Sequence, residues 1–371
     1  MSTGHDSDSP WTDFDRAMMS RALALAQRGL HTTDPNPRVG CVLVHGTDIV
    51  GEGWHERAGE AHAEPRALAA AGAKAHGATA YVSLEPCDHQ GRTPPCTRAL
   101  IAAGVARVIY ALRDPNPRVS GAGEERLRAA GIDVRGGLMA EAARTLNCGY
   151  IKRMETGLPY VRVKLAMSLD ARTALASGES RWITGEAARE DVQEFRARSS
   201  AILTGVGTVL ADDPALTVRL AGTQRQPWRV VLDGALRTPP DAQLLRATGS
   251  VLVIGIREDA ARRAALEARS AAVEILPAVG GRVSLQAVLE RLGQLGMNEL
   301  WVEAGATLAG AFIQAGLYDE LIVYVAPTLL GTDARPLLQL APLASLEHKP
   351  ALRFTDFRAI GDDLRLTLKP A

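Results

Sequence analysis

The sequence predicts an α/β protein of two domains. The chain has 371 residues, which exceeds the size at which one hydrophobic core usually stops growing. Hydrophobic residues make up 46% of it, enough for two cores. Short apolar strand patterns alternate with helical patterns along both halves, which is typical of mixed or parallel sheets covered by helices on both faces.

The first half alternates these patterns at short intervals. Residues 12–29 have apolar residues at helical spacing, a Thr12 or Asp13 cap and a glycine at the end, and residues 39–54 read as a hairpin. The elements expected next are helices at 64–71, 95–103 and 123–130, strands at 78–84, 106–112 and 132–134, and a helical stretch at 139–154.

The second half repeats the alternation on a larger scale. Gly157 and Pro159 end the helical stretch, so the boundary is placed near residue 155. We expect a disordered tail at 1–12, one domain at 13–155 and another at 156–371. The second domain should hold strands at 160–168, 201–204, 229–233, 250–255, 299–303, 320–326, 351–360 and 362–370, and helices at 186–198, 259–269, 284–295 and 307–315.

Charge and cysteine content exclude several classes of protein. The chain has 42 basic and 42 acidic residues, which argues against a polyanion-binding surface over the whole molecule. We find no secretory signal and no apolar run of membrane-spanning length. Four cysteines are too few for a disulfide framework. We therefore expect a cytoplasmic protein with no nucleic-acid or membrane partner.

His62, Cys87 and Cys96 are candidate zinc ligands. A catalytic zinc site uses three protein ligands and leaves the fourth position to water. Glu64 lies two residues after His62, where a carboxylate can move a proton from water to a leaving amine. Three such ligands with one carboxylate suit zinc hydrolysis better than iron or magnesium chemistry.

The expected elements bring these residues together. His62 and Glu64 open a helix whose first turn tolerates Pro65, Cys87 follows a strand, and Cys96 opens another helix, whose N-terminus favours a thiolate. One alternative is a surface histidine with two core cysteines. Another is a structural zinc site with His89 as fourth ligand. A structural site would give the Glu64 carboxylate no water to deprotonate.

Two glycine turns in the second half are candidates for a nicotinamide cofactor. Gly305 lies between a strand and a helix, whose first N–H groups can bind phosphate. Gly205 and Gly207 also follow a strand, but Leu210 occupies the place of the third glycine of the dinucleotide fingerprint. Each turn alone is more often a tight connection.

Four segments of the first half are distinctive: "PNPRVGCVLV", "GEGWHERAGEAHAE", "YVSLEPCDHQGRTPPC" and "DPNPRVSGAG". Together they resemble the deaminase half of the bifunctional deaminase-reductases of riboflavin biosynthesis, a cytidine-deaminase-like α/β/α sandwich. Eight residues separate the two cysteines, whereas cytidine deaminases generally have two between them. Pro65 departs from the family pattern, and we expect it to alter only the helix start.

The resemblance implies a substrate, 2,5-diamino-6-ribosylamino-4(3H)-pyrimidinone 5′-phosphate, whose ring amino group is replaced by water. Zinc is the implied metal, and Glu64 the residue that moves the proton to departing ammonia. Asn36, in "DPNPRVG", either binds the polar edge of the ring or belongs to an ordinary Asn-Pro turn. His55 and His89 either contact the substrate or are solvated loop histidines.

Further segments resemble the reductase half of the same enzymes: "YVRVKLAMSLDARTALASGESRWIT", "RARSSAILTGVGTVLADDPALTVR", "VLDG" and "WVEAGATLAGAFIQAGLYDELIVYVAPTLLG". This half is similar to dihydrofolate reductase. The resemblance implies that NADPH delivers a hydride to the ribosyl carbon attached to nitrogen, giving 5-amino-6-ribitylaminouracil 5′-phosphate. Two family positions are altered, at Ala171 and Gly234.

The resemblance also assigns ligands by position. The residues implied to contact NADPH are Ala166, Trp182, Thr208, Asp212, Gly234, Gly305, Ala306, Thr307, Leu308, Ala309, Gly310 and Ala311. Those implied to contact the substrate are Ser180, Arg196, Leu216, Arg219 and Glu303. Two arginines suit a sugar phosphate. Lys164, expected to face inward on the first strand, either polarises the sugar oxygen or is an ordinary strand lysine.

We therefore expect one chain that performs zinc-dependent deamination and then NADPH-dependent reduction of a small phosphorylated pyrimidine, as a homo-oligomer. A nucleic-acid deaminase with an unrelated C-terminal domain is the enzymatic alternative. It predicts a basic groove and stacking aromatics, which the balanced charge and 4% aromatic content do not favour. A zinc-stabilised nucleotide sensor, the non-enzymatic alternative, predicts NADPH binding without turnover.

Overall fold

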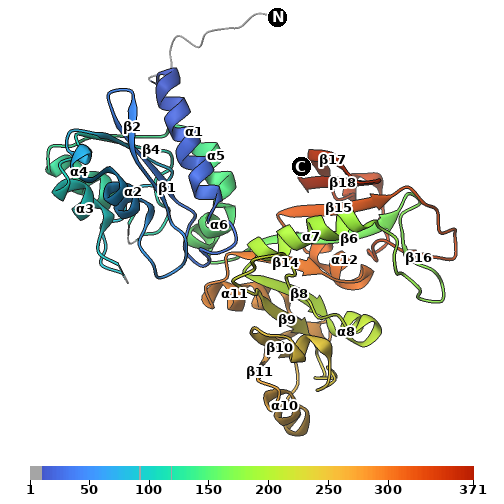
Figure 1. The fold of residues 1–371 in the computed structure, drawn as a ribbon. Helices are drawn as coiled ribbons and strands as arrows, with labels where there is room; N and C mark the ends of the chain where they lie inside the picture. Colours follow the sequence, from blue (N-terminus) through green and yellow to red (C-terminus); the bar gives the residue numbers. More distant parts are fainter. Residues whose placement is uncertain (1–10, 92, 118) are drawn as a thin grey trace, which may run out of the picture. The chain divides into compact units, whose positions relative to one another are not determined.

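The computed structural model describes residues 11–91, 93–117 and 119–371. The chain divides into two compact units, Met1–Thr156 and Gly157–Ala371, each with its own sheet (Figure 1). The expected boundary lies one residue before this division. Residues 1–10 of the expected tail lie outside the described residues, and the tail was wrong for Trp11 and Thr12. Trp11 packs on the core, and the Thr12 hydroxyl caps the first helix.

A mixed sheet of five strands forms the centre of the first unit. Its order is β2-β1-β3-β4-β5. The hairpin strand β1 pairs antiparallel with both β2 and β3, whereas β3, β4 and β5 run parallel. The strands are β1 (Gly40–His45), β2 (Asp48–Trp54), β3 (Thr79–Val82), β4 (Arg107–Tyr110) and β5 (Asp133–Gly136).

Helices cover both faces of this sheet, which confirms the α/β/α sandwich. One face packs against α1 (Asp13–Gln27) and α5 (Ala140–Leu146). The other packs against α2 (Ala63–Ala71), α3 (Cys96–Ala102) and α4 (Ala122–Ala129).

The helical stretch expected at 139–154 is instead two helices, α5 and α6 (Cys148–Thr156). They are separated at Asn147, whose side-chain amide exchanges two hydrogen bonds with the backbone of Arg38 at 2.8 and 2.9 Å. Because these bonds fix Asn147 against a distant segment, the residue leaves helical geometry. A short 3₁₀ helix (Gly72–Ala75) follows α2.

The second unit is built on a nine-stranded sheet in the order β11-β10-β9-β8-β14-β6-β15-β18-β17. The strands from β11 to β15 in this order run parallel, and β18 and β17 add an antiparallel hairpin at one edge. They are β6 (Tyr160–Ser168), β8 (Ala201–Gly205), β9 (Trp228–Leu232), β10 (Val251–Gly255), β11 (Ala271–Ile275), β14 (Glu299–Glu303), β15 (Glu320–Ala326), β17 (Leu352–Ile360) and β18 (Asp363–Pro370).

Helices again lie on both faces. One face packs against α11 (Leu285–Gln294) and α12 (Ala306–Gln314), and the other against α7 (Glu186–Arg198), α8 (Val206–Asp212) and α10 (Ala260–Glu267). The sequence analysis missed α8 and β11. The smaller elements are α9 (Gln243–Arg246), a 3₁₀ helix (Leu346–His348), and the ribbons β12 (Ala278–Val279) with β13 (Arg282–Val283) and β7 (Arg172–Ala174) with β16 (Arg335–Pro336). No helix of the described residues is long and apolar enough to cross a membrane.

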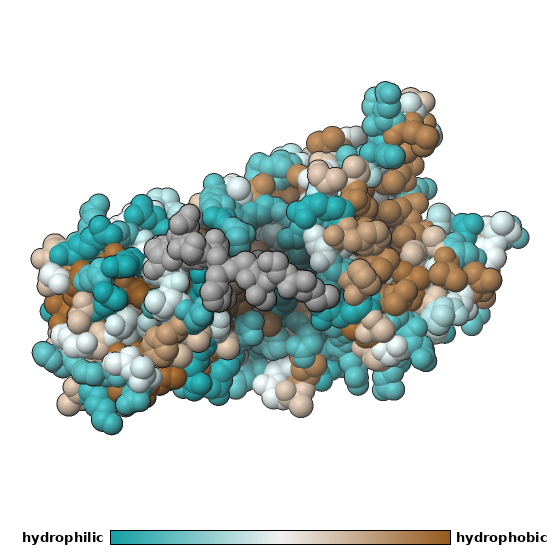
Figure 2. Space-filling model, turned by 90° about the horizontal axis from the view of Figure 1, so that it is seen from above, coloured by the Kyte–Doolittle hydropathy of each residue, from teal (hydrophilic) through white to brown (hydrophobic). Residues whose placement is uncertain are grey.

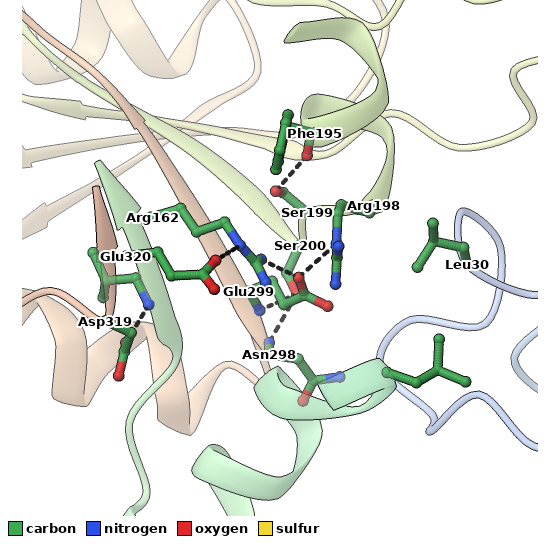
Figure 3. Close-up of polar contacts among 12 residues, drawn as sticks. Leu30, Arg162, Phe195, Arg198, Ser199, Ser200, Asn298, Glu299, Asp319 and Glu320 are labelled. Carbon is green, nitrogen blue, oxygen red and sulfur yellow. Dashed lines mark hydrogen bonds and ion pairs between the residues drawn. The ribbon is translucent and has the colours of Figure 1, made fainter. Parts of the chain in front are cut away.

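A buried ion-pair network holds together the amino ends of the central strands (Figure 3). Arg162 on β6 donates to Glu299, at the start of β14, and to Glu320, at the start of β15. Arg198, at the end of α7, also contacts Glu299, at 2.9 Å. The Ser200 hydroxyl accepts the N–H of Glu299. These contacts fix three strands relative to one another at the edge opposite to their carboxyl ends.

Candidate functional site

The three expected zinc ligands of the first unit converge. His62 is the N-cap of α2, Cys87 lies in the loop after β3, and Cys96 is the first residue of α3. The Sγ atoms of Cys87 and Cys96 lie 3.6 and 3.3 Å from Nδ1 of His62. All three potential ligand atoms lie within 4.8 Å of one another, close enough to share one metal ion.

The surroundings of these atoms fit zinc. Nε2 of His62 lies 3.4 Å from the Thr93 hydroxyl, an outer contact that leaves Nδ1 as the nitrogen for the metal. A hydrogen bond from the Cys96 thiol, together with His62, holds the pKa of Cys87 below its usual range. One imidazole and two thiolates make up a common three-ligand set of catalytic zinc.

Glu64 lies beside this cluster, as the second residue of α2, and is 3% exposed. Burial raises the pKa of its carboxyl group, and the charge of Cys87 raises it further. Its Oε2 has no hydrogen-bond partner within the described part of the chain. A buried carboxyl oxygen without a partner is costly, so its position fits a role in proton transfer better than a structural role.

Two of the three tentative substrate residues join this cluster. Nδ2 of Asn36 lies 3.1 Å from Nε2 of His55, and the rings of His55 and His62 meet edge to face at 5.2 Å between centroids. The described contacts do not connect His89 to either histidine. Its Nδ1 is buried without a partner among the described residues.

Sequence reasoning missed Glu85, which follows β3 two residues before Cys87. Its carboxylate is 3% exposed and accepts the backbone N–H groups of Asp114, Gly121 and Glu124 at 3.1–3.2 Å. It therefore joins the loop of the expected zinc ligand Cys87 to the loop "DPNPRVSG" and to the start of α4. The signal available in the sequence was a glutamate directly after a buried strand, in "SLEPC".

In the second unit, Arg196 on α7 reaches Glu303 at the end of β14, and Lys164 lies beside Glu303 on the neighbouring strand. Lys164 on β6 is in register with Glu303 at the end of β14. Arg196 donates from Nε and Nη2 to the two carboxylate oxygens of Glu303, at 2.5 and 2.8 Å, and from Nη1 to the Thr217 carbonyl. Burial alone would raise the pKa of Glu303, but Arg196 brings it down to about 2.

Lys164 is the second cation of this group. Burial lowers the pKa of its ammonium group, the charge of Arg196 lowers it further, and Glu303 partly opposes both. Lys164 is the fifth of the nine residues of β6, and a lysine with a lowered pKa can act in proton transfer. Arg196 uses three of its five N–H donors within the protein, two of them on Glu303. It therefore fixes the orientation of the Glu303 carboxylate.

The two glycine turns expected to bind cofactor lie on adjacent strands, after β8 and β14. A Cβ placed on Gly205 would lie 3.4 Å from Cδ2 of Leu308, so the turns are neighbours. Gly305 is the exposed N-cap of α12. Within the run expected to contact NADPH, Ala309 is fully buried and a Cβ on Gly310 would meet the Gln339 carbonyl oxygen at 2.2 Å. Gly305 and Thr307 are exposed.

Other expected reductase ligands are placed by neighbouring elements. Trp182 is 70% exposed, and the Arg189 guanidinium lies 4.5 Å from the centroid of its ring. Asp212 ends α8, and its carbonyl accepts a hydrogen bond from Arg181 at 2.7 Å. The remaining positions also lie near carboxyl ends of parallel strands: Ala166 on β6, Thr208 on α8 after β8, and Gly234 after β9.

The other expected substrate residues differ in accessibility. Arg219 is exposed, and its backbone N–H donates to Gln193 at 3.0 Å. Ser180 is half-buried. Leu216 is only 3% exposed and packs in the core beside α7, so its side chain is a core residue rather than a ligand.

Asp170 is a second residue that sequence reasoning missed. Its carboxylate accepts the N–H groups of Leu330 and Gly331, so it joins the loop after β6 to the loop after β15. Its pKa is lowered to about 2 by hydrogen bonds, first that of the Ser168 hydroxyl. Ala171, one of the two altered family positions, has a φ of 58°, a left-handed conformation that favours glycine.

Two family models match the chain, one for each unit. The model described as the cytidine and deoxycytidylate deaminase zinc-binding region matches residues 12–112. The model described as the RibD C-terminal domain matches residues 159–366. The first match covers His62, Cys87 and Cys96, and the second covers Lys164, Arg196 and Glu303. The units thus carry a zinc-binding deaminase region and a reductase domain.

Similar proteins cover almost the whole chain. The riboflavin biosynthesis protein RibD of Escherichia coli (strain K12) is 52% identical, over 95% of this chain and 99% of its own length. The Haemophilus influenzae protein of the same name is 48% identical, over 96% and 97%.

Solved structures agree with these relatives. Acinetobacter baumannii RibD, form 1, is 45% identical with a TM-score of 0.90, over 96% of this chain and 99% of that one. A diaminohydroxyphosphoribosylaminopyrimidine deaminase/5-amino-6-(5-phosphoribosylamino)uracil reductase from Thermotoga maritima is 32% identical with a TM-score of 0.85, over the same shares. The chain belongs to the RibD family, the bifunctional deaminase-reductases of riboflavin biosynthesis.

Proposed function

We propose that the chain catalyses two consecutive reactions on one phosphorylated pyrimidine. The first is hydrolytic deamination of 2,5-diamino-6-ribosylamino-4(3H)-pyrimidinone 5′-phosphate. The second is NADPH-dependent reduction of the ribosyl group, giving 5-amino-6-ribitylaminouracil 5′-phosphate. The observation that carries this proposal is the convergence of His62, Cys87 and Cys96 beside Glu64, whose buried Oε2 has no hydrogen-bond partner among the described residues. The name of the similar Thermotoga maritima enzyme supports both steps.

In the deaminase unit, Glu64 is the proposed catalytic acid and base. Zinc bound to His62, Cys87 and Cys96 would supply a polarised water. The oxygen of that water would add to the amino-bearing ring carbon, and Oε2 of Glu64 would take the proton of the water and pass it to the ring amino group, which leaves as ammonia when the C–N bond breaks. The raised pKa of the carboxyl group suits it to holding a proton between these two transfers.

Asn36 and His55 are the proposed residues for the polar edge of the pyrimidine. Nε2 of His55 lies 3.1 Å from the Asn36 amide nitrogen, so each side chain helps to orient the other. Nδ1 of His55 lies 3.1 Å from the Ala61 carbonyl, next to His62. Burial lowers the pKa of His55, which favours a neutral ring that can accept the amide hydrogen bond. His89 remains a tentative substrate residue of the neighbouring loop.

In the reductase unit, Lys164 and Glu303 are proposed to act on the sugar. NADPH would supply the hydride to the ribosyl carbon attached to nitrogen. Lys164 gives a proton to the ring oxygen as the sugar opens, and its lowered pKa favours that transfer. Glu303, held by Arg196, binds a sugar hydroxyl. Ser180 and the exposed Arg219 complete the proposed substrate site, with Leu216 contributing backbone only.

The proposed cofactor site lies along the carboxyl ends of β6, β8, β9 and β14. Gly305 and the first turn of α12 present N–H groups to the cofactor phosphates. Trp182 is exposed and can stack on a planar ring. The proposed contacts are Ala166, Trp182, Thr208, Asp212, Gly234, Gly305, Ala306, Thr307, Leu308 and Ala311.

We also propose that the protein works in the cytoplasm, without nucleic acid, as a homo-oligomer. The alternative of a nucleic-acid deaminase with an unrelated second domain is not favoured, because the RibD C-terminal model spans residues 159–366. The purified protein, supplied with the diaminopyrimidinone, should release ammonia and then consume NADPH, and a zinc chelator should abolish the ammonia. Ammonia release that resists complete removal of zinc would refute the proposal.

A further inference from the structure

Trp301 donates a hydrogen bond to the Glu303 carboxylate from inside the core. Both residues are on β14, two positions apart, so their side chains point to the same face of the sheet. The Nε1–H group of Trp301 donates to Oε1 of Glu303 at 2.8 Å. Trp301 is fully buried and packs with residues of α7, beneath the surface that Figure 2 shows. A ring so placed does not contact a ligand, so any effect on one must pass through a neighbour.

The ring of Phe195 holds this indole in place. The two rings are stacked, with their centroids 4.7 Å apart and their planes at 10°. Phe195 directly precedes Arg196 on α7, and its carbonyl accepts a hydrogen bond from the Ser199 hydroxyl at 2.7 Å (Figure 3). The Arg365 guanidinium lies 5.3 Å from the centroid of the Phe195 ring. Because stacked rings attract each other beyond the area that they bury, the N–H group of Trp301 has a fixed direction.

The hydrogen bonds divide unequally between the two oxygens of Glu303. Burial would raise the pKa of this carboxyl group, but Arg196 lowers it to about 2, so it is ionised and each oxygen can accept about two hydrogen bonds. Oε1 accepts two, from Nε of Arg196 at 2.5 Å and from Nε1 of Trp301. Among the described residues, Oε2 accepts one, from Nη2 of Arg196 at 2.8 Å. Oε2 therefore keeps an acceptor position for a ligand.

We propose that Trp301 is a positioning residue of the reductase site, which occupies Oε1 of Glu303 and so leaves Oε2 as the oxygen that binds a sugar hydroxyl. This inference rests on the proposed reduction of a ribosyl group. Without the indole N–H, Oε1 would offer an acceptor position as well, and the hydroxyl could bind to either oxygen. Lys164 lies in register with Glu303 on the neighbouring strand, so a hydroxyl bound to the wrong oxygen would also move the sugar relative to the lysine ammonium group.

The substitution Trp301→Phe tests this role, because it removes the N–H group and keeps an aromatic ring against Phe195. We measure steady-state reduction of the deaminated pyrimidine by NADPH with the full-length protein. The KM for the pyrimidine should rise about tenfold, the size of one hydrogen bond to a charged group, while kcat and the KM for NADPH stay within about twofold of wild type. A change in stability alone lowers the amount of active enzyme and hence the apparent kcat, but it does not alter KM.

The matched control is Trp228→Phe. Trp228 is partly buried at the start of β9 and packs against the core on the other face of the same sheet, so this variant should keep the wild-type KM. A wild-type protein that does not reduce the deaminated pyrimidine would refute the proposed function, and this inference with it. A wild type that reduces it, with the same KM in Trp301→Phe, would overturn the positioning role alone.

A measurement on the unsubstituted indole keeps the test decisive if Trp301→Phe does not fold. The chain has five tryptophans, so substituting the other four one at a time assigns the Trp301 indole N–H signal in the NMR spectrum of protein labelled with ¹⁵N-tryptophan. Adding 5-amino-6-ribitylaminouracil 5′-phosphate without NADPH should shift this signal, because a hydroxyl bound at Oε2 draws charge from Oε1 of Glu303. The Trp228 signal should not move. A Trp301 signal that stays in place at saturating ligand would overturn the proposal.

Discussion

Glu303 accepts two hydrogen bonds from Arg196, Nε to Oε1 at 2.5 Å and Nη2 to Oε2 at 2.8 Å, and lies in register with Lys164 on the neighbouring strand. This fork fixes the plane of the carboxylate beside the lysine. Both residues of the pair are mostly buried, with side chains 10% and 15% exposed. The reductase site is therefore held by an ion pair between a helix and a strand end.

The substitution Arg196→Lys should impair reduction and spare deamination. Lysine keeps the charge but cannot form the two-pronged contact, so Glu303 would lose its fixed orientation. We expect kcat/KM for reduction to fall at least about tenfold, the size of one lost charged hydrogen bond, with unchanged ammonia release. Arg263→Lys, on the outer helix α10, is the matched control and should leave both rates unchanged. An equal loss in both variants would contradict the assignment.

The same pair should make stability depend on pH. The pKa of Glu303 is about 2 in the folded protein, against an ordinary value of 4.5. Between these values the unfolded chain binds the proton and the folded chain does not, so stability falls as pH falls from about 4.5 toward 2. Urea unfolding of wild type and Glu303→Gln at pH 5 and pH 3 measures this. The variant should lose less stability over that interval; an identical loss would show that Glu303 does not contribute.

Arg162→Met should destabilise the reductase unit by about 3 kcal/mol, because it removes a partner from buried charges. Glu299 is 1% exposed and would lose one of the two arginine contacts described above, while Glu320 would lose its closest cation. Urea denaturation, monitored by the tryptophan fluorescence of the reductase unit, measures the change in the free energy of unfolding. Arg353→Met, an exposed change on β17, should cost well under 1 kcal/mol. Similar losses of stability in the two variants would show that the buried network stabilises the unit no more than an exposed charge does.

Ala171→Gly should stabilise the same unit by about 1 kcal/mol, because alanine is strained in left-handed backbone. Ala171 has a φ of 58°. The control Ala221→Gly changes an exposed loop alanine that is not in this conformation, and it should be neutral or slightly destabilising. Calorimetric melting of the two variants distinguishes these effects. A lower melting temperature for Ala171→Gly would contradict the strain argument.

The zinc ligands could be predicted from sequence because their residue types and the ends of their helices and strands point to one chemistry. Arg196 and Glu303 were both expected to contact the substrate, but their ion pair could not be predicted, because the two residues are 107 positions apart in the chain. Helix α8 was missed because it has only seven residues and contains Gly207, a poor helix former. The break at Asn147 depends on the backbone of Arg38, 109 residues distant. Hydrogen bonds between residues far apart in the chain determine these features, and local sequence patterns do not reveal such bonds.

The most direct test of the central claim uses Glu64→Gln, with wild type as reference. We predict that the variant still binds one zinc, releases ammonia at least about a hundredfold more slowly, and reduces the already deaminated pyrimidine with NADPH at the wild-type rate. Metal analysis, ammonia release and NADPH absorbance are measured on the same preparation. Ammonia release at the wild-type rate with zinc bound would contradict the account.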